Sequence, residues 1–548
     1  DDLINQSLDD MRKIQERVAV TGPYASLQSS GDSTSQENQM RIGAYSIMMQ
    51  GVSEKLSFYN NTIQRLDDNM LKSAVNKSKE HKLYLEEILK NKKHMLTPEV
   101  EQALVVLSPT LNAAYNTYNR FKLVDMKFDD FKVENNVYPN SFTLFENEWE
   151  YEKNTKVRRA AYASFYDKLG QYQHGLAANY ISHLQKEKAL AKLRGFDSTI
   201  DYLLHHQEVS RDFMDRQIDV IMEKLAPAMR KYAKLLKDIH GLEHMTYADL
   251  KVAVDAEFEP KVTIESAKDY LVEGLSILGP EYLDIVKRSF DERWIDFPQN
   301  IGKSTGGFCS SPYGANSFIL VNWNGQMDEV MVLAHEIGHA GHFQYANKHQ
   351  NIFNARPSMY FIEAPSTTNE LIMTRHLLKQ AKDLRLRRWI LSVMISRTYY
   401  HNFVTHLLEA AFQREVYTML DQDKPLSAHV LNQTKLAVIK RFWGDEIVID
   451  DYAGLTWMRQ PHYFMGLYPY TYSAGLTIGT VVSSKLFDGS LKHDDWIKVL
   501  KTGGTKSPQA LAQMVGVDLT TTKPLEDAID FIADSIEDII AITKQLKD

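Results

Sequence analysis

The residues of this sequence best suited to chemistry are two histidines and a glutamate in the segment 331–342. His335 and His339 are four residues apart, and Glu336 directly follows the first of them. On an α-helix, which turns about 100° and rises about 1.5 Å per residue, side chains at that spacing lie one above the other. Two such imidazoles can bind one metal ion. Glu336 can then reach a water on that ion, as the glutamate of zinc peptidases does.

A third ligand is predicted further along the chain. Catalytic zinc takes three protein ligands and keeps a fourth position open, and a carboxylate from a neighbouring helix is a common third ligand. Glu363 lies 28 residues after His335 and shortly before Pro365. Because proline is tolerated only in a first helical turn, we expect a second helix to begin at or near Glu363. Glu363 is therefore our candidate ligand.

Glu370 lies two turns along the same predicted helix and on the same side as Glu363. A carboxylate there can accept a hydrogen bond from the outer nitrogen of a ligand histidine, which fixes the tautomer of the ring and raises its basicity. The alternative is that Glu370 is an exposed helix carboxylate. Six residues after His339 stands Tyr345 and not the histidine of a metzincin. For His342 we predict packing, or a hydrogen bond behind a ligand, in preference to metal binding.

A short strand is predicted directly before the metal-binding helix. Residues 317–323 are apolar and β-like, Asn324-Gly325 suits a turn, and Asp328 suits an N-cap. A strand in this position could pair along its edge with an extended peptide, which makes Phe318 and Asn322 possible substrate-binding residues.

Two glycines interrupt the metal-binding helix. Gly338 and Gly341 each cost about 1 kcal/mol of helix stability relative to alanine. Two glycines in this helix make sense if another part of the protein approaches its backbone closely. We predict such a close approach at Gly338 and Gly341.

The segment 458–472 carries a further group of polar aromatic residues. Hydrolysis of a peptide bond creates an oxyanion that a histidine or a tyrosine hydroxyl can stabilise, typically by about 10²–10³ in rate. His462, Tyr468, Tyr470 and Tyr472 could supply such donors. Clustered tyrosines are also ordinary core and groove residues, and the spacing alone leaves both interpretations open.

The chain around these segments is mainly helical. Its 548 residues are 44% apolar, which is enough for a large core and predicts two or three lobes. Residues 1–125 show helical periodicity and form a predicted N-terminal lobe. A hairpin or irregular linker is predicted around residues 128–145, and the rest, 126–548, forms a second domain with the metal site within 300–475. Short β-like stretches between 294 and 323 predict a small sheet beside the metal-binding helix.

Charge and cysteine content limit the kinds of partner and the cellular compartment that we expect for this protein. The chain has 63 basic and 71 acidic residues, a net charge of −8, and no long basic run, so neither nucleic acid nor an anionic membrane is an expected partner. The single cysteine, Cys309, excludes an internal disulfide framework and is interpreted as a small buried hydrophobe. Without an 18-residue apolar run or a signal-peptide pattern at the first residues given, we expect a soluble, cytoplasmic protein. Nothing in the sequence predicts an oligomeric state.

The motifs together resemble the M3 family of zinc metallopeptidases, the thimet oligopeptidase group, and most closely its bacterial branch, oligoendopeptidase F. The resemblance spans at least residues 240–475. Beyond the metal-binding helix, it rests on the stretches 241–250, 292–296, 318–323 and 363–366. It implies a mostly helical, two-lobed shell around a deep channel, and short unfolded peptides as substrates.

The same resemblance implies roles for the candidate residues. One zinc ion per chain would be bound by His335, His339 and Glu363, with Glu336 as general base and later general acid, and Glu370 behind a ligand.

His462 and Tyr470 would donate hydrogen bonds to the scissile carbonyl. The tyrosines follow His462 by 6, 8 and 10 residues, which departs from the thimet oligopeptidase pattern, so Tyr468 and Tyr472 remain alternatives to Tyr470.

Two other functions are compatible with parts of the pattern. A helical metallocarboxypeptidase of the Taq type is also built on a two-histidine helix, although its second motif differs from Glu363-Ala-Pro-Ser. A non-catalytic peptide-binding protein could keep the scaffold, but it would be expected to have lost a ligand or the base, and this chain retains them all.

Overall fold

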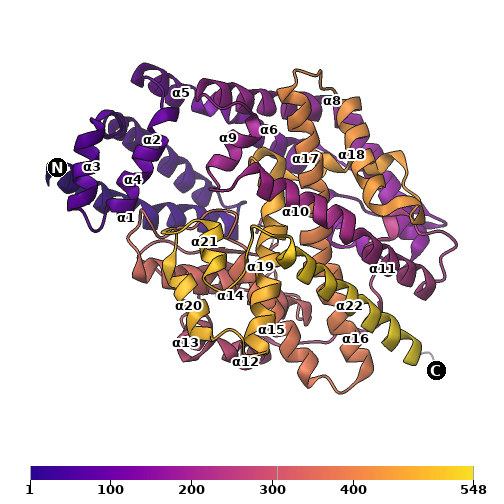
Figure 1. The fold of residues 1–548 in the computed structure, drawn as a ribbon. Helices are drawn as coiled ribbons and strands as arrows, with labels where there is room; N and C mark the ends of the chain where they lie inside the picture. Colours follow the sequence, from indigo (N-terminus) through magenta and orange to yellow (C-terminus); the bar gives the residue numbers. More distant parts are fainter. Residues whose placement is uncertain (1, 301, 305, 547–548) are drawn as a thin grey trace. The chain divides into compact units, whose positions relative to one another are not determined.

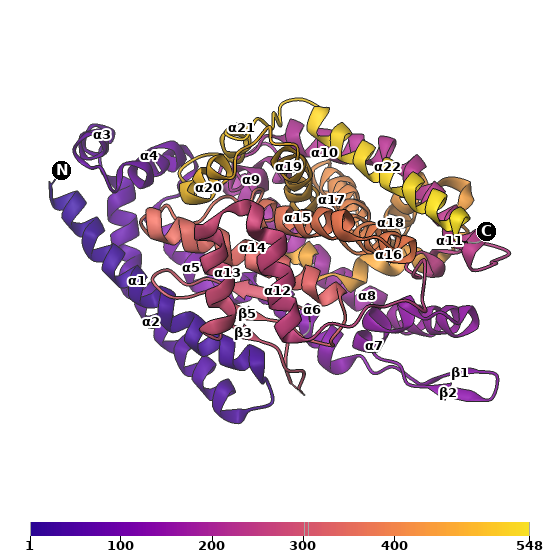
Figure 2. The same cartoon turned by 90° about the horizontal axis from the view of Figure 1, so that it is seen from below.

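The chain folds mainly into helices, as a computed structural model shows (Figures 1 and 2). The structure describes residues 2–300, 302–304 and 306–546. The helices and short strands form two compact units, each assembled from three segments of the chain. The prediction of a mainly α fold with a small sheet beside the metal-binding helix is confirmed.

Unit 1 comprises Asp1–Val105, Pro260–His376 and Ile478–Asp518. Its strands are β3 Ile295–Asp296, β4 Phe308–Ser310 and β5 Phe318–Leu320. Its helices are α1 Asp2–Gly31, α2 Gln36–Arg65, α3 Asp68–Lys77, α4 Lys82–Asn91, α12 Ile264–Gly274, α13 Pro280–Asp291, α14 Asp328–His349, α20 His493–Thr502 and α21 Pro508–Gln513.

Unit 2 comprises Val106–Glu259, Leu377–Thr477 and Leu519–Asp548. Its α-helices are α6 Ala113–Arg120, α7 Phe142–Asn147, α8 Thr155–Leu193, α9 Thr199–His205, α10 Arg211–Lys224, α11 Ala226–Ile239, α16 Leu384–Val393, α17 His406–Asp421, α18 Ala428–Trp443 and α22 Lys523–Gln545. Three helices have residues in both units: α5 Pro98–Leu111, α15 Ala364–Gln380 and α19 Pro469–Phe487.

The predicted hairpin is present in unit 2. Strands β1 Phe131–Val133 and β2 Asn136–Tyr138 pair in antiparallel fashion, and Figure 2 shows them as a two-stranded ribbon. The boundary predicted near residue 125 stays a prediction.

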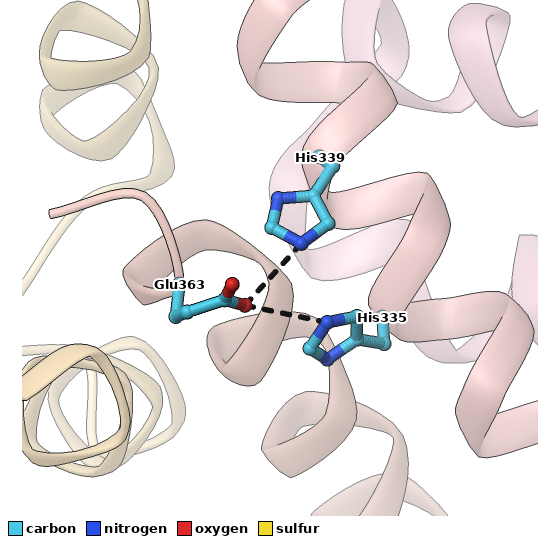
Figure 3. A group of neighbouring side chains, drawn as sticks. All are labelled: His335, His339 and Glu363. Carbon is cyan, nitrogen blue, oxygen red and sulfur yellow. Dashed lines mark ion pairs between the residues drawn. The ribbon is translucent and has the colours of Figure 1, made fainter. Parts of the chain in front are cut away.

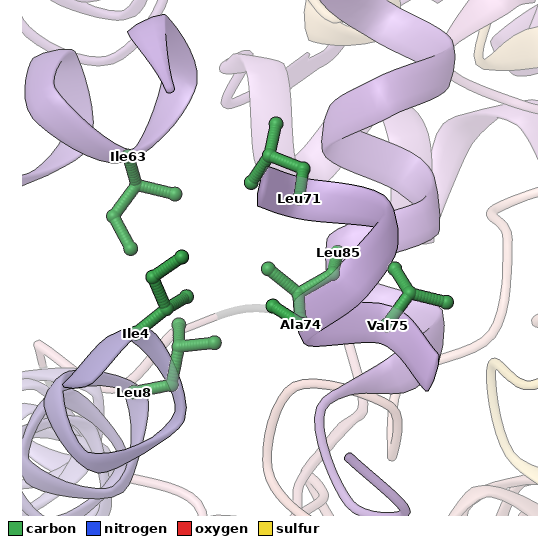
Figure 4. Close-up of a cluster of buried hydrophobic side chains, with 7 residues drawn as sticks. All are labelled: Ile4, Leu8, Ile63, Leu71, Ala74, Val75 and Leu85. Atoms are coloured by element: carbon green, nitrogen blue, oxygen red, sulfur yellow. The ribbon is translucent and has the colours of Figure 1, made fainter. Parts of the chain in front are cut away.

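The first four helices of unit 1 pack around an apolar cluster of their own (Figure 4). Each of the four helices contributes at least one buried apolar side chain to it. The cluster consists of Ile4, Leu8, Ile63, Leu71, Ala74, Val75 and Leu85. The break between α1 and α2 falls at residues 32–35, within the stretch 29–38, which contains no apolar side chain.

A three-stranded sheet lies beside the metal-binding helix α14 in unit 1, in the order β3-β5-β4. Strand β5 pairs with β3 in parallel and with β4 in antiparallel fashion. The prediction that residues 317–323 offer a free edge to a peptide is therefore wrong, because both edges of β5 are already hydrogen-bonded. Sequence periodicity predicts a strand but does not tell a central strand from an edge strand. The two edges of the sheet belong to β3 and β4.

Helix α14 begins at Asp328, which is its first residue; the N-cap position is occupied by Met327 and not by Asp328 as predicted. Asp328 and Glu329 in the first turn and Lys348 and His349 in the last turn match the polarity of the helix dipole. The helix packs against α13 and α20.

The two glycines of α14 lie where neighbouring parts of unit 1 contact its backbone. A Cβ atom on Gly338 would lie 2.5 Å from the Cα atom of Ser366, so α14 and α15 cross backbone to backbone at this point. A Cβ atom on Gly341 would lie 2.6 Å from the ring of Tyr282 on α13. The predicted close approach is confirmed at both positions, and at Gly338 it brings the start of α15 against the metal-binding helix.

A buried ion pair precedes the segment that carries His462 in unit 2. Arg459 donates from Nη1 to Glu150 Oε1 at 2.7 Å and to the hydroxyl of Tyr166 at 3.1 Å. All three side chains are largely buried. Truncating one partner of such a pair typically costs about 3–5 kcal/mol, so this contact fixes the chain three residues before His462.

Among the described residues, no helix is long and apolar enough to cross a membrane.

Candidate metal centre

The three predicted metal ligands come together in unit 1 (Figure 3). His335 and His339 project from one face of α14, and Glu363 reaches toward them from the residue just before α15. Glu363 Oε2 lies 3.4 Å from His335 Nε2 and 3.3 Å from His339 Nε2. One ligand atom from each residue lies within 4.8 Å of the others. The group is thus convergent, and it is built by two helices whose crossing depends on Gly338.

The spacing of these atoms fits a tetrahedral metal ion. Ligands bound at about 2.0–2.1 Å with tetrahedral angles lie about 3.3–3.4 Å from one another. The two distances from Glu363 Oε2 match this value. The His335 side chain is 25% exposed and that of His339 14%, whereas that of Glu363 is only 7% exposed, so the histidine side of the group is open to a further ligand. The donor set fits a divalent ion with a remaining open position.

The charges around Glu363 also favour metal binding. Burial disfavours ionisation of Glu363, but the neighbouring His339 and His335 outweigh it and hold the pKa of this carboxyl well below its usual range. Glu363 is therefore ionised at neutral pH, as a ligand must be.

Glu370 lies directly behind one of the histidines. Its Oε1 atom is 2.6 Å from His335 Nδ1, while the Nε2 atom of the same ring faces Glu363. The side chain of Glu370 is 12% exposed, which disfavours the alternative of an exposed helix carboxylate. A hydrogen bond to Nδ1 leaves the lone pair on Nε2, which is the nitrogen that a metal ion would use.

Glu336 is buried next to the centre with an unused oxygen. The residue is 5% exposed, and its Oε2 atom has no hydrogen-bond partner among the residues that the structure describes. Burial raises the pKa of this carboxyl above its ordinary value. A Cβ atom placed on Gly307 would be 3.3 Å from Glu336 Oε1, so the loop before β4 lies against the carboxylate. An unpartnered buried carboxylate oxygen is what a proton acceptor for water requires.

Two residues that hold the centre together were missed by the sequence analysis. The Ser366 hydroxyl donates to Glu363 Oε2 at 3.0 Å and thereby orients the ligand carboxylate. Asn369 Nδ2 donates to the Ala334 carbonyl at 3.0 Å and to the Tyr282 hydroxyl at 2.9 Å, which ties α15 to α14 and α13. Asn369 is a polar residue at a buried helix position, and this was the one sign in the sequence that it has a structural role. Its hydrogen-bond partners can be identified only from the packing of the helices.

His342 and Cys309 play no part in the ligand group. His342 is fully buried, packs against Phe343 and Phe361, and has its pKa lowered by burial and by His339 to about 3, so its ring stays neutral. Burial raises the pKa of the Cys309 thiol to about 12, which argues against a nucleophile.

The predicted oxyanion donors lie in unit 2. His462 is on the short helix η9 Pro461–Phe464, and its ring centroid lies 5.5 Å from that of Tyr468 and 5.7 Å from that of Tyr472. The Tyr472 hydroxyl is 3.4 Å from His462 Nε2. These three side chains are partly exposed.

Tyr470 is placed differently. It is 1% exposed, and its hydroxyl bonds to the buried side chain of Gln207. The reason is the helix that begins at Pro469: residues 468 and 472 are one turn apart on one face, and residue 470 lies on another. The structure therefore gathers Tyr468 and Tyr472 around His462 and leaves Tyr470 in the core.

Phe318 and Asn322 show no common site. Phe318 is 41% exposed on the central strand β5. The Asn322 side chain donates to the carbonyls of Ser304 and Gly306 at 3.0 and 2.9 Å, so it orders the loop before β4.

Two family models match the chain. The model described as "Peptidase family M3" matches residues 149–531, and the one described as "Oligopeptidase F" matches residues 63–128. The first range contains α14, α15 and the segment around His462.

Curated relatives and solved structures agree with these matches. The chain is 28% identical to "Oligopeptidase PepF" of Bacillus subtilis, over 100% of this chain and 82% of that protein. It is 26% identical to an "Oligoendopeptidase F homolog" of Borreliella burgdorferi, over 98% of this chain and 91% of that protein. The crystal structure of oligoendopeptidase-F from Enterococcus faecium superposes with a TM-score of 0.78 at 21% identity, covering 99% of this chain and 94% of that one.

Proposed function

Because the chain belongs to peptidase family M3, we propose that this metalloendopeptidase is zinc-dependent and cuts internal bonds of short, unfolded peptides. The observation that carries the proposal is the convergence of His335, His339 and Glu363 beside the unpartnered carboxylate oxygen of Glu336. Neither a carboxypeptidase of the Taq type nor a non-catalytic binding protein is favoured by the family match. A cytoplasmic location stays part of the proposal.

His335, His339 and Glu363 would hold one zinc ion, a ligand set of two histidines and a glutamate that is common at catalytic zinc. When bound, such an ion supplies a Lewis acid that polarises a carbonyl and makes water acidic enough to react near neutral pH. Glu370 keeps the His335 ring in the tautomer that offers Nε2.

Glu336 moves the protons. Its free oxygen accepts a proton from water as the water oxygen bonds to the peptide carbon. It then returns that proton to the amide nitrogen as the carbon–nitrogen bond breaks. The products are a carboxylic acid and an amine, so water and peptide are consumed one for one and Glu336 is regenerated.

His462 and a tyrosine would donate hydrogen bonds to the oxyanion. This role rests on the family resemblance for His462 and on the local geometry for the tyrosine. We favour Tyr472 or Tyr468 over Tyr470, because the two former side chains face His462 and the last is bonded in the core.

The peptide itself is proposed to align along β4, the edge strand whose preceding loop lies against Glu336. Phe318 would then support this edge from β5, and Asn322, just after β5, would support it through its hydrogen bonds to the loop before β4.

The proposed function is tested with one good cleavage sequence presented in three ways. We expect the purified protein to cut it in a free peptide of about 5 to 20 residues, which spans about 17 to 66 Å when extended. Amidation of the C-terminus should leave the rate unchanged, and a chelator should abolish cleavage until zinc is restored. The same sequence in an exposed loop of a stable folded protein should resist cleavage.

Loss of activity on amidation would replace the endopeptidase by a carboxypeptidase. Equal kcat/KM values for the free peptide and the folded loop would remove the restriction to unfolded oligopeptides. Activity that persists in chelator would remove the metal from the proposal.

The tyrosines give a matched pair of variants. Tyr472→Phe is expected to lower kcat by about 10²–10³-fold with little change in thermal stability, because its hydroxyl would act on the oxyanion. Tyr470→Phe should leave kcat nearly unchanged and cost about 1–3 kcal/mol of stability, because a buried hydrogen bond with Gln207 is lost. Steady-state kinetics and thermal melts of both variants check this. A large kcat loss in Tyr470→Phe alone would reverse the assignment.

A further inference from the structure

A second group of metal-binding side chains lies wholly within unit 2. His406 begins α17, Glu409 follows one turn later, and His462 comes from η9. One ligand atom from each lies within 4.8 Å of the others. His406 is fully buried, Glu409 is 3% exposed, and His462 is partly exposed. The group is therefore an interior arrangement and not a chance meeting of surface carboxylates.

The contacts within this group show how closely its donor atoms converge. His406 Nδ1 lies 2.8 Å from Glu409 Oε2, and His406 Nε2 lies 3.0 Å from the Nε2 atom of His401. The rings of His406 and His462 meet edge to face with centroids 4.8 Å apart. Two imidazoles and one carboxylate thus converge, and the third imidazole, that of His401, adjoins His406.

The local helix geometry explains this convergence. Residues 394–405 form a π-helical stretch, in which residues five apart come onto the same side of the helix. His401 and His406 have this spacing, and on a regular α-helix they would diverge. Tyr472 stacks flat on His406, with centroids 4.0 Å apart and ring planes 11° apart, and so fixes the ring. Irregular π-helical turns are frequently found at functional sites.

The chemistry of the group suits a transition metal. Imidazole nitrogen and carboxylate oxygen are the donors that zinc and its neighbours accept, and two histidines with one carboxylate leave a coordination position open. Glu409 and Lys435 line a cavity of about 70 Å³ together with Glu150 and Arg459, so Glu409 borders a space that can hold water. Lys435 and Arg459 line the same cavity and are cations that oppose the binding of a metal ion. Burial lowers the pKa of Lys435 to about 8.

We propose that His406, Glu409 and His462 form a second site for a divalent transition-metal ion, separate from the ion at His335, His339 and Glu363. It binds more weakly than the first site, because Lys435 opposes the charge and the hydrogen bonds of His406 with Glu409 and His401 must yield. An ion here takes one ring nitrogen of His462 and holds the ring against His406. If His462 acts as the proposed function requires, excess zinc therefore inhibits the enzyme.

The test is a zinc titration of the full-length protein at pH 8, with free zinc set by a competing chromophoric chelator. We expect the wild-type protein to bind a second, weaker zinc ion that dialysis removes. Glu409→Gln should lose this second ion and keep the first. The matched control is Glu187→Gln, which alters a buried glutamate of unit 2 that pairs with His183 at 3.1 Å but belongs to no group of three ligands among the described residues. It should still bind both ions.

A second pair of variants tests the same site in case the Glu409→Gln protein folds poorly. In Glu363→Ala protein, where the first site is disabled, the weaker ion should remain and should disappear on adding His406→Gln. Binding of cobalt in place of zinc gives an independent count from its visible absorption. A wild-type protein that saturates with one ion, or a Glu409→Gln variant that still binds two, overturns the proposal.

Inhibition is measured on the same samples. Excess zinc should inhibit wild-type and Glu187→Gln proteins over the range in which the second ion binds, and Glu409→Gln should be resistant. Absence of peptidase activity would speak against the proposed function alone, because the ion count does not depend on turnover. If a second ion binds but does not inhibit, the second site is supported and its proposed effect on His462 is wrong.

Discussion

Glu336→Gln protein is expected to lose turnover almost completely while it keeps its tightly held metal ion. The substitution is isosteric and removes only the ability of the side chain to accept and return a proton. General acid–base catalysis typically contributes about 10²–10⁴-fold, and we expect a loss of kcat of that order or larger. Glu336 is adjacent to His335 in sequence but outside the ligand group, so metal affinity should hold.

The measurement combines kcat with elemental analysis after dialysis, which leaves the tight site occupied at about one ion per chain. Glu265→Gln on α12, an exposed glutamate of the same unit, is the control and should match the wild type in both. Loss of the tight ion in Glu336→Gln would identify Glu336 as a ligand. Retained turnover would transfer the role of base to another residue.

Glu363→Ala is expected to act on metal binding itself. The variant removes the only carboxylate of the ligand group and leaves His335 and His339 without the anion that faces both rings. Because two imidazoles alone bind a divalent ion far more weakly, dialysed protein should contain little metal and show little activity.

Glu370→Ala is expected to weaken metal binding less than Glu363→Ala does. The carboxylate of Glu370 contacts His335 from behind, and loss of such a partner typically lowers metal affinity or activity by about 10–100-fold. Measured zinc affinities should therefore rank wild type above Glu370→Ala and Glu370→Ala above Glu363→Ala. Full zinc content in dialysed Glu363→Ala protein would place the third ligand elsewhere, and an unaltered Glu370→Ala protein would show that the bond to His335 has no consequence for the metal.

Local sequence was sufficient for the helix that carries the histidines. A spacing of four residues fixes two side chains on one helical face whatever surrounds them, and a proline near Glu363 restricts where the next helix starts. The glycines of α14 also carried information, since their cost to the helix is useful only where a neighbour approaches closely, as Ser366 does at Gly338.

Local sequence could not predict how the strands pair or which way the tyrosine side chains point. The apolar pattern of residues 317–323 is the same for a central strand as for an edge strand, and the structure makes β5 central. The alternating tyrosines after His462 are spaced by two, which suggests a shared face only on a strand; the helix α19 instead separates Tyr470 from Tyr472.

What the sequence determined by itself is the chemistry available: two imidazoles and a base at fixed helical spacing, a carboxylate 28 residues further on, and the family to which these motifs belong. The tertiary structure decided which distant groups meet. Glu363, Ser366 and Asn369 come against α14 because two helix backbones touch at Gly338, and His462 meets His406 because the chain folds back between residues 406 and 462. Helical spacing is a property of neighbouring residues and can be read locally, whereas such contacts depend on how whole helices pack.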